Sequence, residues 1–206
     1  MKIKVCGMRE AENIREVEAL GVDLMGFIFW PKSSRFVSKR PEYLPTKCKR
    51  VGVFVDEDIT KVKATASEYG LDYIQLHGKE STEYVKKLGG YHLIKAFNIA
   101  TAEDFEVCQV YEGLVDFFLF DTKGKSVGGN GEKFDWSVLE AYQGETPFLL
   151  SGGIGPDDAQ SLSQPSRSLS LPKGHPQFAG IDLNSKFEIS PALKNVEQLR
   201  KFLNEL

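Results

Sequence analysis

The chain has 206 residues, of which 26 are Lys or Arg, 29 are Asp or Glu and 41% are hydrophobic, so its formal net charge is −3. This composition is typical of a soluble globular protein. Because no dense run of Lys and Arg is present, neither a nucleic acid nor an anionic membrane is expected as a partner, and a small molecule is the expected ligand.

The N-terminal stretch and the cysteines favour a reducing, cytoplasmic setting. The first residues carry charges inside a short apolar stretch, without a cleavage signal, and no run of about 18 apolar residues occurs, so we expect neither secretion nor a membrane span. The three cysteines, Cys6, Cys48 and Cys108, show no CxxC or CxxH spacing. That pattern argues against a disulfide framework and against a structural zinc site.

Short β-branched or aromatic runs alternate with amphipathic stretches along the chain. Strands are predicted at residues 3–6, 23–29, 50–55, 72–76, 91–97, 115–120, 147–150 and 178–183. Helices are predicted at 10–20, weakly at 40–44, at 58–69 and 82–88, from Thr101, after a cap at Asp135, from Pro156, and over about 192–203. The stretch 163–177 is rich in Ser and Pro and is interpreted as a surface loop, because another unit follows it.

Eight strand-helix units predict a closed (β/α)8 barrel, an α/β fold of the TIM-barrel type. An open doubly wound sheet is the alternative, since some of the weaker units could be over-counted. Eight units use nearly all of the sequence, so residues 1–206 are predicted to form one catalytic domain. In such a barrel the chemistry lies at the carboxyl ends of the strands and in the loops after them.

Two residues stand at these strand ends with side chains suited to proton transfer. Cys6 closes the first strand and is followed at once by Gly7, and Asp121 follows the apolar sixth strand. A carboxylate at the end of a buried strand must be paired, solvated or functional, because unpaired burial is costly. The plainer alternatives are that Cys6 is a small core residue and that Asp121 caps the loop after it.

Strand alternation places Lys4 on the same face as Cys6, and it places Asp182 on one face of the neighbouring eighth strand. If Ile3 and Val5 face the helices, Lys4 points into the barrel beneath Cys6 and needs a carboxylate. We therefore predict a buried Lys4–Asp182 ion pair, with its charged groups within about 4 Å. The same ammonium is expected to lower the pKa of the Cys6 thiol from its free value of about 8.5. The alternative is an outward Lys4 with its stem against a helix.

Four further residues are candidates for ligand binding. Gly152 and Gly153 follow the seventh strand and precede a helix, so their backbone N–H groups and the helix dipole favour an anion such as phosphate, unless they only form a tight turn. His77 ends the fourth strand and shares the inward parity of Gln75, with a purely structural role as the alternative. Arg35, in the loop after the second strand, is able to pair bidentately with a carboxylate or is simply solvated.

Six groups of residues follow one another at barrel-unit spacing: Lys4-Val5-Cys6-Gly7, Gly26-Phe27-Ile28-Phe29 with Ser33-Ser34-Arg35-Phe36-Val37, Gln75-Leu76-His77-Gly78, Phe120-Asp121-Thr122 with Gly128-Gly129-x-Gly131-x-x-Phe134-x-Trp136, Leu150-Ser151-Gly152-Gly153-Ile154, and Gly180-Ile181-Asp182-Leu183. Taken together, these segments resemble the phosphoribosylanthranilate isomerase family of tryptophan biosynthesis. They span nearly the whole chain, and their common order at barrel-unit spacing makes the combined signal specific.

The resemblance implies an Amadori rearrangement of N-(5-phospho-β-D-ribosyl)anthranilate to 1-(2-carboxyphenylamino)-1-deoxy-D-ribulose 5-phosphate, without a metal or an organic cofactor. It implies that a protonated Asp121 is the general acid that opens the furanose ring to a Schiff base. It also implies that Cys6, as a thiolate, is the base that removes the proton from C2.

The resemblance assigns substrate binding to Arg35, His77, Gly152, Gly153 and Asp182. Arg35 would pair with the anthranilate carboxylate, and the amides of Gly152 and Gly153 would hold the phosphate. A phosphosugar is then the expected partner, and the chain is expected to be a monomer or a homodimer.

The chain departs from the family pattern after the eighth strand. Asn184 and Ser185 are followed by Lys186 where Gly is usual, and residues 191–195 read Pro-Ala-Leu-Lys-Asn where Pro-Gly-x-Lys-Asp is usual. The phosphate contacts of this loop therefore stay open, and Lys186 either adds a charge near the phosphate or points to solvent. The stretch 163–177 is also longer than the family minimum.

Two other functions stay open. Another phosphosugar barrel, such as an epimerase or an indole-glycerol-phosphate synthase type, needs a His/Asp metal-ligand set or a catalytic Lys and Glu pair, and the sequence shows neither at the predicted strand ends. A catalytically silent sensor of an aminated ribose phosphate is disfavoured by the presence of both Cys6 and Asp121. Whether a related histidine-pathway substrate is accepted is left open.

Overall fold

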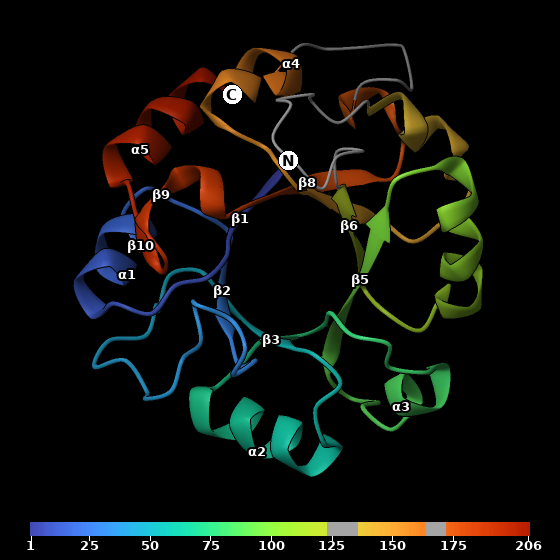
Figure 1. The fold of residues 1–206 in the computed structure, drawn as a ribbon, viewed down its shortest axis with the longest axis horizontal. Coiled ribbons are helices and arrows are strands. Elements are labelled where there is room, and N and C mark those ends of the chain that lie inside the picture. Colours follow the sequence, from blue (N-terminus) through green and yellow to red (C-terminus); the bar gives the residue numbers. More distant parts are fainter. Residues whose placement is uncertain (123–135, 164–171) are drawn as a thin grey trace.

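The computed structural model describes residues 1–122, 136–163 and 172–206. Parallel strands close into an eight-stranded barrel in chain order: β1 (Lys2–Val5), β2 (Leu24–Ile28), β3 (Lys49–Phe54), β4 (Tyr73–Leu76), β5 (His92–Ile99), β6 (Phe117–Thr122), β7 (Phe148–Ser151) and β8 (Phe178–Leu183). Figure 1 looks down this ring of strands, with the helices arranged around it. The predicted barrel is confirmed, because β8 pairs with β1 and leaves no open edge between them.

Helices surround the strands on the outside of the barrel. They are α1 (Ala11–Glu18), α2 (Ile59–Tyr69), α3 (Thr82–Lys86), α4 (Ala159–Ser163) and α5 (Val196–Glu205), with the 3-10 helices η1 (Ala102–Tyr111), η2 (Trp136–Ala141), η3 (Pro156–Asp158), η4 (Pro172–Gly174) and η5 (Ser185–Phe187). The helix predicted from Thr101 is therefore the 3-10 helix η1, with the expected Thr101–Asp104 capping box. A small antiparallel hairpin, β9 (Glu188–Ser190) with β10 (Leu193–Lys194), precedes α5.

The weak helix predicted at residues 40–44 is wrong, because this segment is an irregular loop. Pro41 disfavours helical backbone at the residue before it and lacks an N–H of its own. The carboxylate of Glu18 on α1 holds the loop instead, accepting hydrogen bonds from the Tyr43 hydroxyl and from the N–H groups of Thr46 and Lys47.

The closing helix begins at Val196 rather than near residue 192. Ala192 has left-handed backbone, with φ 69°, which ends any helical run through it. The helix is capped instead by Asn195, whose side chain accepts a hydrogen bond from the N–H of Gln198. The predicted cap at Asp135, the glycine-rich loop before it and residues 164–171 of the predicted surface loop lie outside the described residues.

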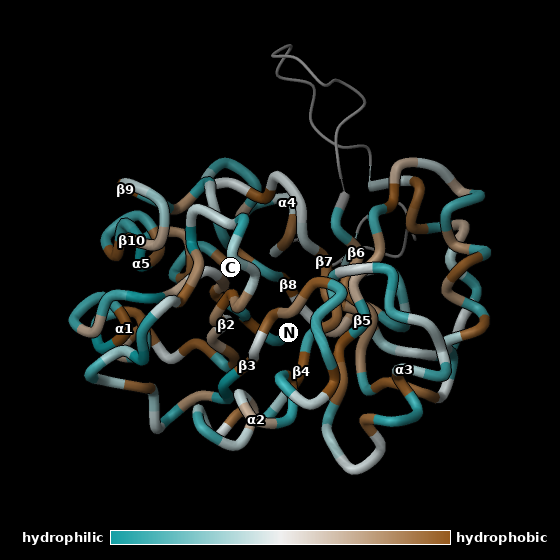
Figure 2. The backbone as a smooth tube through the Cα atoms, turned by 60° about the horizontal axis from the view of Figure 1, so that its bottom comes forward, coloured by the Kyte–Doolittle hydropathy of each residue, from teal (hydrophilic) through white to brown (hydrophobic). Residues whose placement is uncertain are grey.

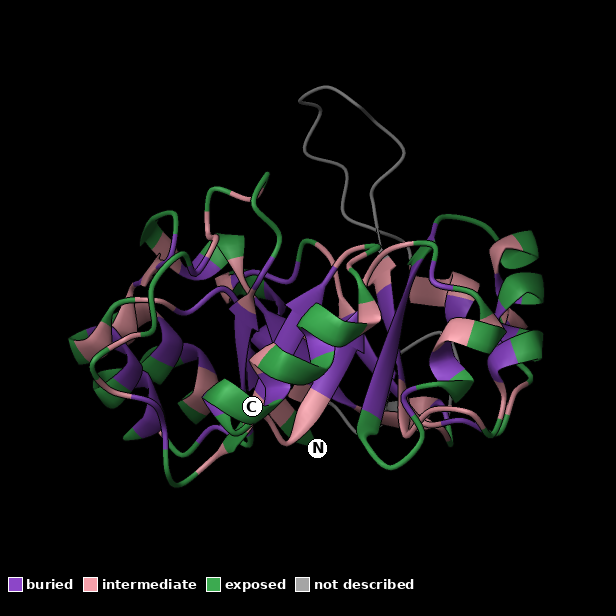
Figure 3. Cartoon of the chain, turned by 90° about the horizontal axis from the view of Figure 1, so that it is seen from below, coloured by how far each residue is buried: buried purple, intermediate pink, exposed green. Residues whose placement is uncertain are grey.

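The core has two layers, one inside the barrel and one between the strands and the helices. The inner cluster is Leu24, Val51, Ile94, Ala96, Leu119 and Leu149. Figure 2 shows the hydrophobic stretches along the strands, and Figure 3 shows that the buried residues concentrate there while the helices expose their outer faces. Gly26 on β2 and Asp121 on β6 point inward on the same faces as the cluster residues Leu24 and Leu119, two positions further along each strand. The apolar inner cluster therefore lies directly below Gly26 and Asp121 in the barrel.

Among the described residues, no helix is long and apolar enough to cross a membrane.

Candidate active site

Cys6 directly follows β1, and the neighbouring strand β2 makes room for its thiol. Its backbone N–H donates to the carbonyl of Leu183 at 2.9 Å, and the residue is 4% exposed. A Cβ added to Gly26 on β2 would lie 2.6 Å from Sγ of Cys6. Gly26 therefore has to lack a side chain for the thiol to occupy this position.

The predicted Lys4–Asp182 ion pair is confirmed, with Nζ of Lys4 3.0 Å from Oδ2 of Asp182 inside the barrel. The two residues face each other in the β1–β8 register. Burial lowers the pKa of Lys4, but Asp182 and Cys6 outweigh it and raise that pKa above its usual value, so the lysine is charged. Burial also raises the pKa of Asp182 and prevails over Lys4, which lowers it.

The expectation of a lowered Cys6 pKa is wrong for this structure. Burial raises the pKa of the Cys6 thiol, and the Lys4 ammonium lowers it by less. The reason is that a fully buried thiolate loses its hydration, while one nearby ammonium already shared with Asp182 restores only part of that stabilisation.

Replacing Lys4 with Met is expected to lower the free energy of unfolding by about 3–5 kcal/mol, because Asp182 is left as an unpaired buried charge. Urea unfolding measures this loss. The matched control is the double variant Lys4→Met with Asp182→Leu, which removes both charges and should recover most of the stability. A double variant as unstable as the single one would contradict this reading of the pair.

Asp121 lies on β6 and faces His77, which follows β4. Nε2 of His77 is 3.5 Å from Oδ2 of Asp121, and both side chains are partly exposed, at 30% and 23%. On its other side the His77 ring contacts Gln75, with Nδ1 3.1 Å from Nε2 of the amide. The predicted inward parity of Gln75 and His77 is thereby confirmed. Asp182 also interacts electrostatically with His77 and Asp121, so three strands contribute to one polar cluster.

Arg35 is bound by a residue that the sequence did not indicate. Its Nε lies 2.9 and 3.0 Å from the two carboxylate oxygens of Glu188, and its Nη2 lies 2.5 Å from Oε2. Glu188 also pairs with the fully buried Lys194 at 2.6 Å. A Cβ added to Gly7, next to Cys6, would lie 2.7 Å from Cδ of Arg35, so the methylene stem of Arg35 runs past the backbone that follows Cys6.

Gly152 and Gly153 directly follow β7 and have left-handed backbone, with φ 90° and 71°. The helix expected after them is only the 3-10 turn η3 followed by the five-residue α4, so little helix dipole is available there. Lys186 is exposed, in agreement with the solvent-facing alternative.

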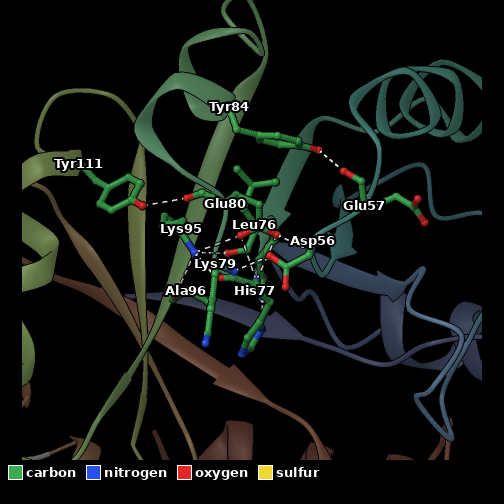
Figure 4. A network of polar contacts seen from close by, with 12 residues as sticks. Asp56, Glu57, Leu76, His77, Lys79, Glu80, Tyr84, Lys95, Ala96 and Tyr111 are labelled. Carbon is green, nitrogen blue, oxygen red and sulfur yellow. Dashed lines mark hydrogen bonds and ion pairs between the residues drawn. The ribbon is translucent and has the colours of Figure 1, made fainter.

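A buried Lys and Glu pair, which the sequence analysis did not find, lies beside His77 (Figure 4). Nζ of Lys95 is 3.2 Å from Oε2 of Glu80. The ammonium also donates to backbone carbonyls, those of Leu76, Gly78 and Ala96. The carboxylate accepts from the N–H groups of Asp56 and Gly78. Because both groups are buried and bound to backbone, this pair braces the strand ends rather than facing a ligand.

Among the described residues, no group of three His, Cys, Asp or Glu side chains is placed to hold a metal ion.

A parallel barrel that brings a thiol, a carboxylate and an imidazole to the carboxyl ends of its strands has the architecture of the (β/α)8-barrel enzymes. The family model of N-(5'phosphoribosyl)anthranilate (PRA) isomerase matches residues 3–205. The chain belongs to this family, and the resemblance drawn from the sequence is confirmed. It is an isomerase of tryptophan biosynthesis.

Curated relatives and solved structures agree with this assignment. N-(5'-phosphoribosyl)anthranilate isomerases of Phocaeicola vulgatus and Parabacteroides distasonis are each 52% identical, over 100% of this chain and 98% and 93% of their own lengths. The phosphoribosyl anthranilate isomerase of Thermotoga maritima superposes with a TM-score of 0.80 at 29% identity, covering 100% of this chain and 98% of that one. Another solved isomerase, with a TM-score of 0.78 at 27% identity and coverage of 100% and 97%, holds reduced 1-(o-carboxyphenylamino)-1-deoxyribulose 5-phosphate.

Proposed function

We propose that Cys6 and Asp121 carry out the Amadori rearrangement of N-(5-phospho-β-D-ribosyl)anthranilate as base and acid. Asp121 gives its proton to the furanose ring oxygen, the C1–O bond breaks, and the amine lone pair forms the C1=N bond of the Schiff base. The Cys6 thiolate then takes the proton from C2, and the C–H electrons flow to the iminium nitrogen to give the enolamine, which tautomerises to the ketone. The observation that supports this assignment is the placement of both groups at carboxyl strand ends of one barrel.

The binding roles follow from the charges around these two groups. Arg35 would pair with the anthranilate carboxylate, since Glu188 occupies the Nε edge of its guanidinium and orients the rest. The amides of Gly152 and Gly153 would hold the phosphate. His77 and Asp182 would complete the contacts to the sugar between these ends, so that C2 lies over Cys6.

The proposal extends to the domain organisation, the oligomeric state and the cofactor requirement of the protein. Residues 1–206 would form one catalytic domain, working in the cytoplasm as a monomer or a homodimer. One solved structure is described as monomers generated from the dimeric phosphoribosylanthranilate isomerase of Thermotoga maritima. The reaction would need no metal and no organic cofactor, because the iminium nitrogen of the substrate is the electron sink.

Replacing Glu188 with Gln is expected to raise KM about tenfold with kcat little changed, because Arg35 loses a charge-assisted partner worth about 1.5–3 kcal/mol. Steady-state kinetics separate the two constants. The matched control is Glu12→Gln, which removes an exposed ion pair with Arg15 on α1 and should leave both constants unchanged. A fall in kcat with KM unchanged would contradict the binding role of Arg35.

The direct test is a continuous fluorescence assay with phosphoribosylanthranilate generated in situ from anthranilate. Once all the anthranilate has been converted to the fluorescent phosphoribosylanthranilate, adding the purified protein should make the fluorescence of this substrate decay. Substrate that binds without turning over would instead support a silent sensor and overturn the proposal.

A further inference from the structure

We propose that Gln75 is a positioning residue that sets the tautomer of His77, so that the neutral ring presents its Nε2–H to Asp121. The inference rests on the general-acid role proposed above for Asp121. It adds Gln75, whose side chain contacts His77 and which acts through that residue.

The polarity of the Gln75–His77 contact determines where the ring carries its proton. Gln75 lies on the inward face of β4 and is 1% exposed. Its amide nitrogen faces Nδ1 of His77 at 3.1 Å. An amide nitrogen is only a donor, so Nδ1 has to accept. A neutral imidazole that accepts at Nδ1 carries its proton on Nε2, and Nε2 is the atom that faces Asp121 at 3.5 Å.

The buried surroundings of Gln75 favour this orientation of its amide. Among the residues that the structure describes, Oε1 of Gln75 is buried without a hydrogen-bond partner, which costs about 1–3 kcal/mol. Turning the amide over would let Oε1 accept from an Nδ1–H of His77 but would leave both N–H groups of the amide in this buried position, against one N–H group and the oxygen in the orientation seen here. A buried unsatisfied group of this kind requires an explanation, and the contact with His77 provides one.

The backbone on both sides of His77 is fixed independently of its side chain. The ammonium of Lys95 holds the carbonyls of Leu76 and Gly78, and Glu80 holds the N–H of Gly78 (Figure 4). In Figure 4 the His77 ring extends away from this pair. The Lys95–Glu80 pair therefore fixes the backbone of His77, and Gln75 orients its ring.

This arrangement suits the moment at which Asp121 loses its proton. The carboxylate that remains gains a hydrogen bond from an Nε2–H that is already aimed at it, without the cost of turning the ring. The distance of 3.5 Å is long for such a bond, and it is expected to shorten as negative charge develops on the carboxylate. The reverse tautomer would face the new carboxylate with a lone pair and repel it.

Nitrogen NMR of the imidazole rings in the unliganded enzyme tests the tautomer directly. The chain has three histidines, and the variant His77→Asn assigns the His77 signals by their loss. The wild-type enzyme should show the Nε2–H tautomer of the neutral His77 ring. Gln75→Glu places an acceptor against Nδ1 and should move the ring to the Nδ1–H or the doubly protonated form, with kcat lowered about tenfold or more and KM little changed.

A second variant and a matched control keep the test interpretable. Gln75→Met replaces Gln75→Glu in the test if the latter does not fold, because it retains the length of the side chain without the amide. It should give a mixture of His77 tautomers and a kcat between those of wild type and of an enzyme with the Nδ1–H form. The control Asp116→Asn breaks another His–carboxylate contact, that of His92 with Asp116 at 2.9 Å, and should change neither kcat nor the His77 spectrum.

Two results would overturn the inference: an Nδ1–H form of His77 in the wild-type enzyme, or Gln75 variants that leave both the tautomer and kcat unchanged. Failure of the proposed function looks different. In that case Asp121→Asn would keep full turnover, while the Gln75 variants would still change the His77 tautomer. The change of tautomer would then leave kcat unchanged.

Discussion

Cys6→Ala will lower kcat by about two orders of magnitude or more, because the variant lacks the group that we propose as the base for the C2 proton. The smaller side chain leaves the ion pair beneath it intact, so the variant should still fold and bind substrate. Steady-state kinetics in the fluorescence assay give kcat, and fluorescence titration at limiting turnover gives the affinity. Retained turnover would refute the role of Cys6.

The chain supplies its own controls for this experiment, Cys48→Ala and Cys108→Ala. Both thiols are free, and burial raises the pKa of each to about 12. Neither lies at a strand end of the site, so both variants should keep wild-type kcat, which separates the loss of the base from a general effect of removing a thiol.

The pH profile of the wild-type enzyme carries the signature of the same residue. A base has to be unprotonated, and burial raises the pKa of the Cys6 thiol. The thiolate fraction of Cys6 in the free enzyme therefore grows with pH above the ordinary thiol pKa of about 8.5, and the ultraviolet thiolate absorbance that the Cys6→Ala variant lacks should rise through the alkaline range. A Cys6 thiolate that is already fully formed at neutral pH would contradict the effect of burial on this thiol.

Asp121→Asn will also lower kcat by about two orders of magnitude or more, because an amide cannot make the proton transfer to the ring oxygen that we propose for Asp121. The replacement has nearly the same shape and can still accept a hydrogen bond from His77, so KM should change much less than kcat. Single-turnover kinetics should show a slow chemical step after normal binding. The control is Asp116→Asn, which alters a carboxylate at the opposite ends of the strands. Turnover within tenfold of wild type would exclude Asp121 as the acid.

Most of the site geometry followed from strand alternation, which is a local property of the sequence. Lys4, Cys6 and Asp182 could be placed on inward faces because side chains alternate with a period of two, and parallel pairing of the first and last strands brought the charges together. The same rule placed Gln75 and His77 together. The inward or outward direction of a side chain depends only on its position along the strand. Predicted strand ends that were one or two residues off, as at β6, therefore did not change the predicted directions.

The features that were missed depend on long-range packing. Glu188 reaches Arg35 across a sequence separation of 153 residues, through a hairpin that begins beyond β8, and no local pattern indicates that approach. The pKa of Cys6 depends on the balance between burial and one shared ammonium, which a sequence does not contain. Lys95 did leave a signal, since it is a charged residue inside the apolar strand β5, where an unpaired lysine is too costly.

The missing side chain at Gly26 links two positions on neighbouring strands into one unit. The sulfur of Cys6 lies where a Cβ at residue 26 would be, so residue 26 cannot be enlarged while residue 6 keeps its place. A larger side chain at residue 6, such as that of Asp or Glu, would in turn collide with the backbone of β2 at Gly26. Engineering of the base in this barrel therefore has to treat residues 6 and 26 as a pair, and combinatorial libraries that vary residue 6 alone will sample mostly unproductive geometries.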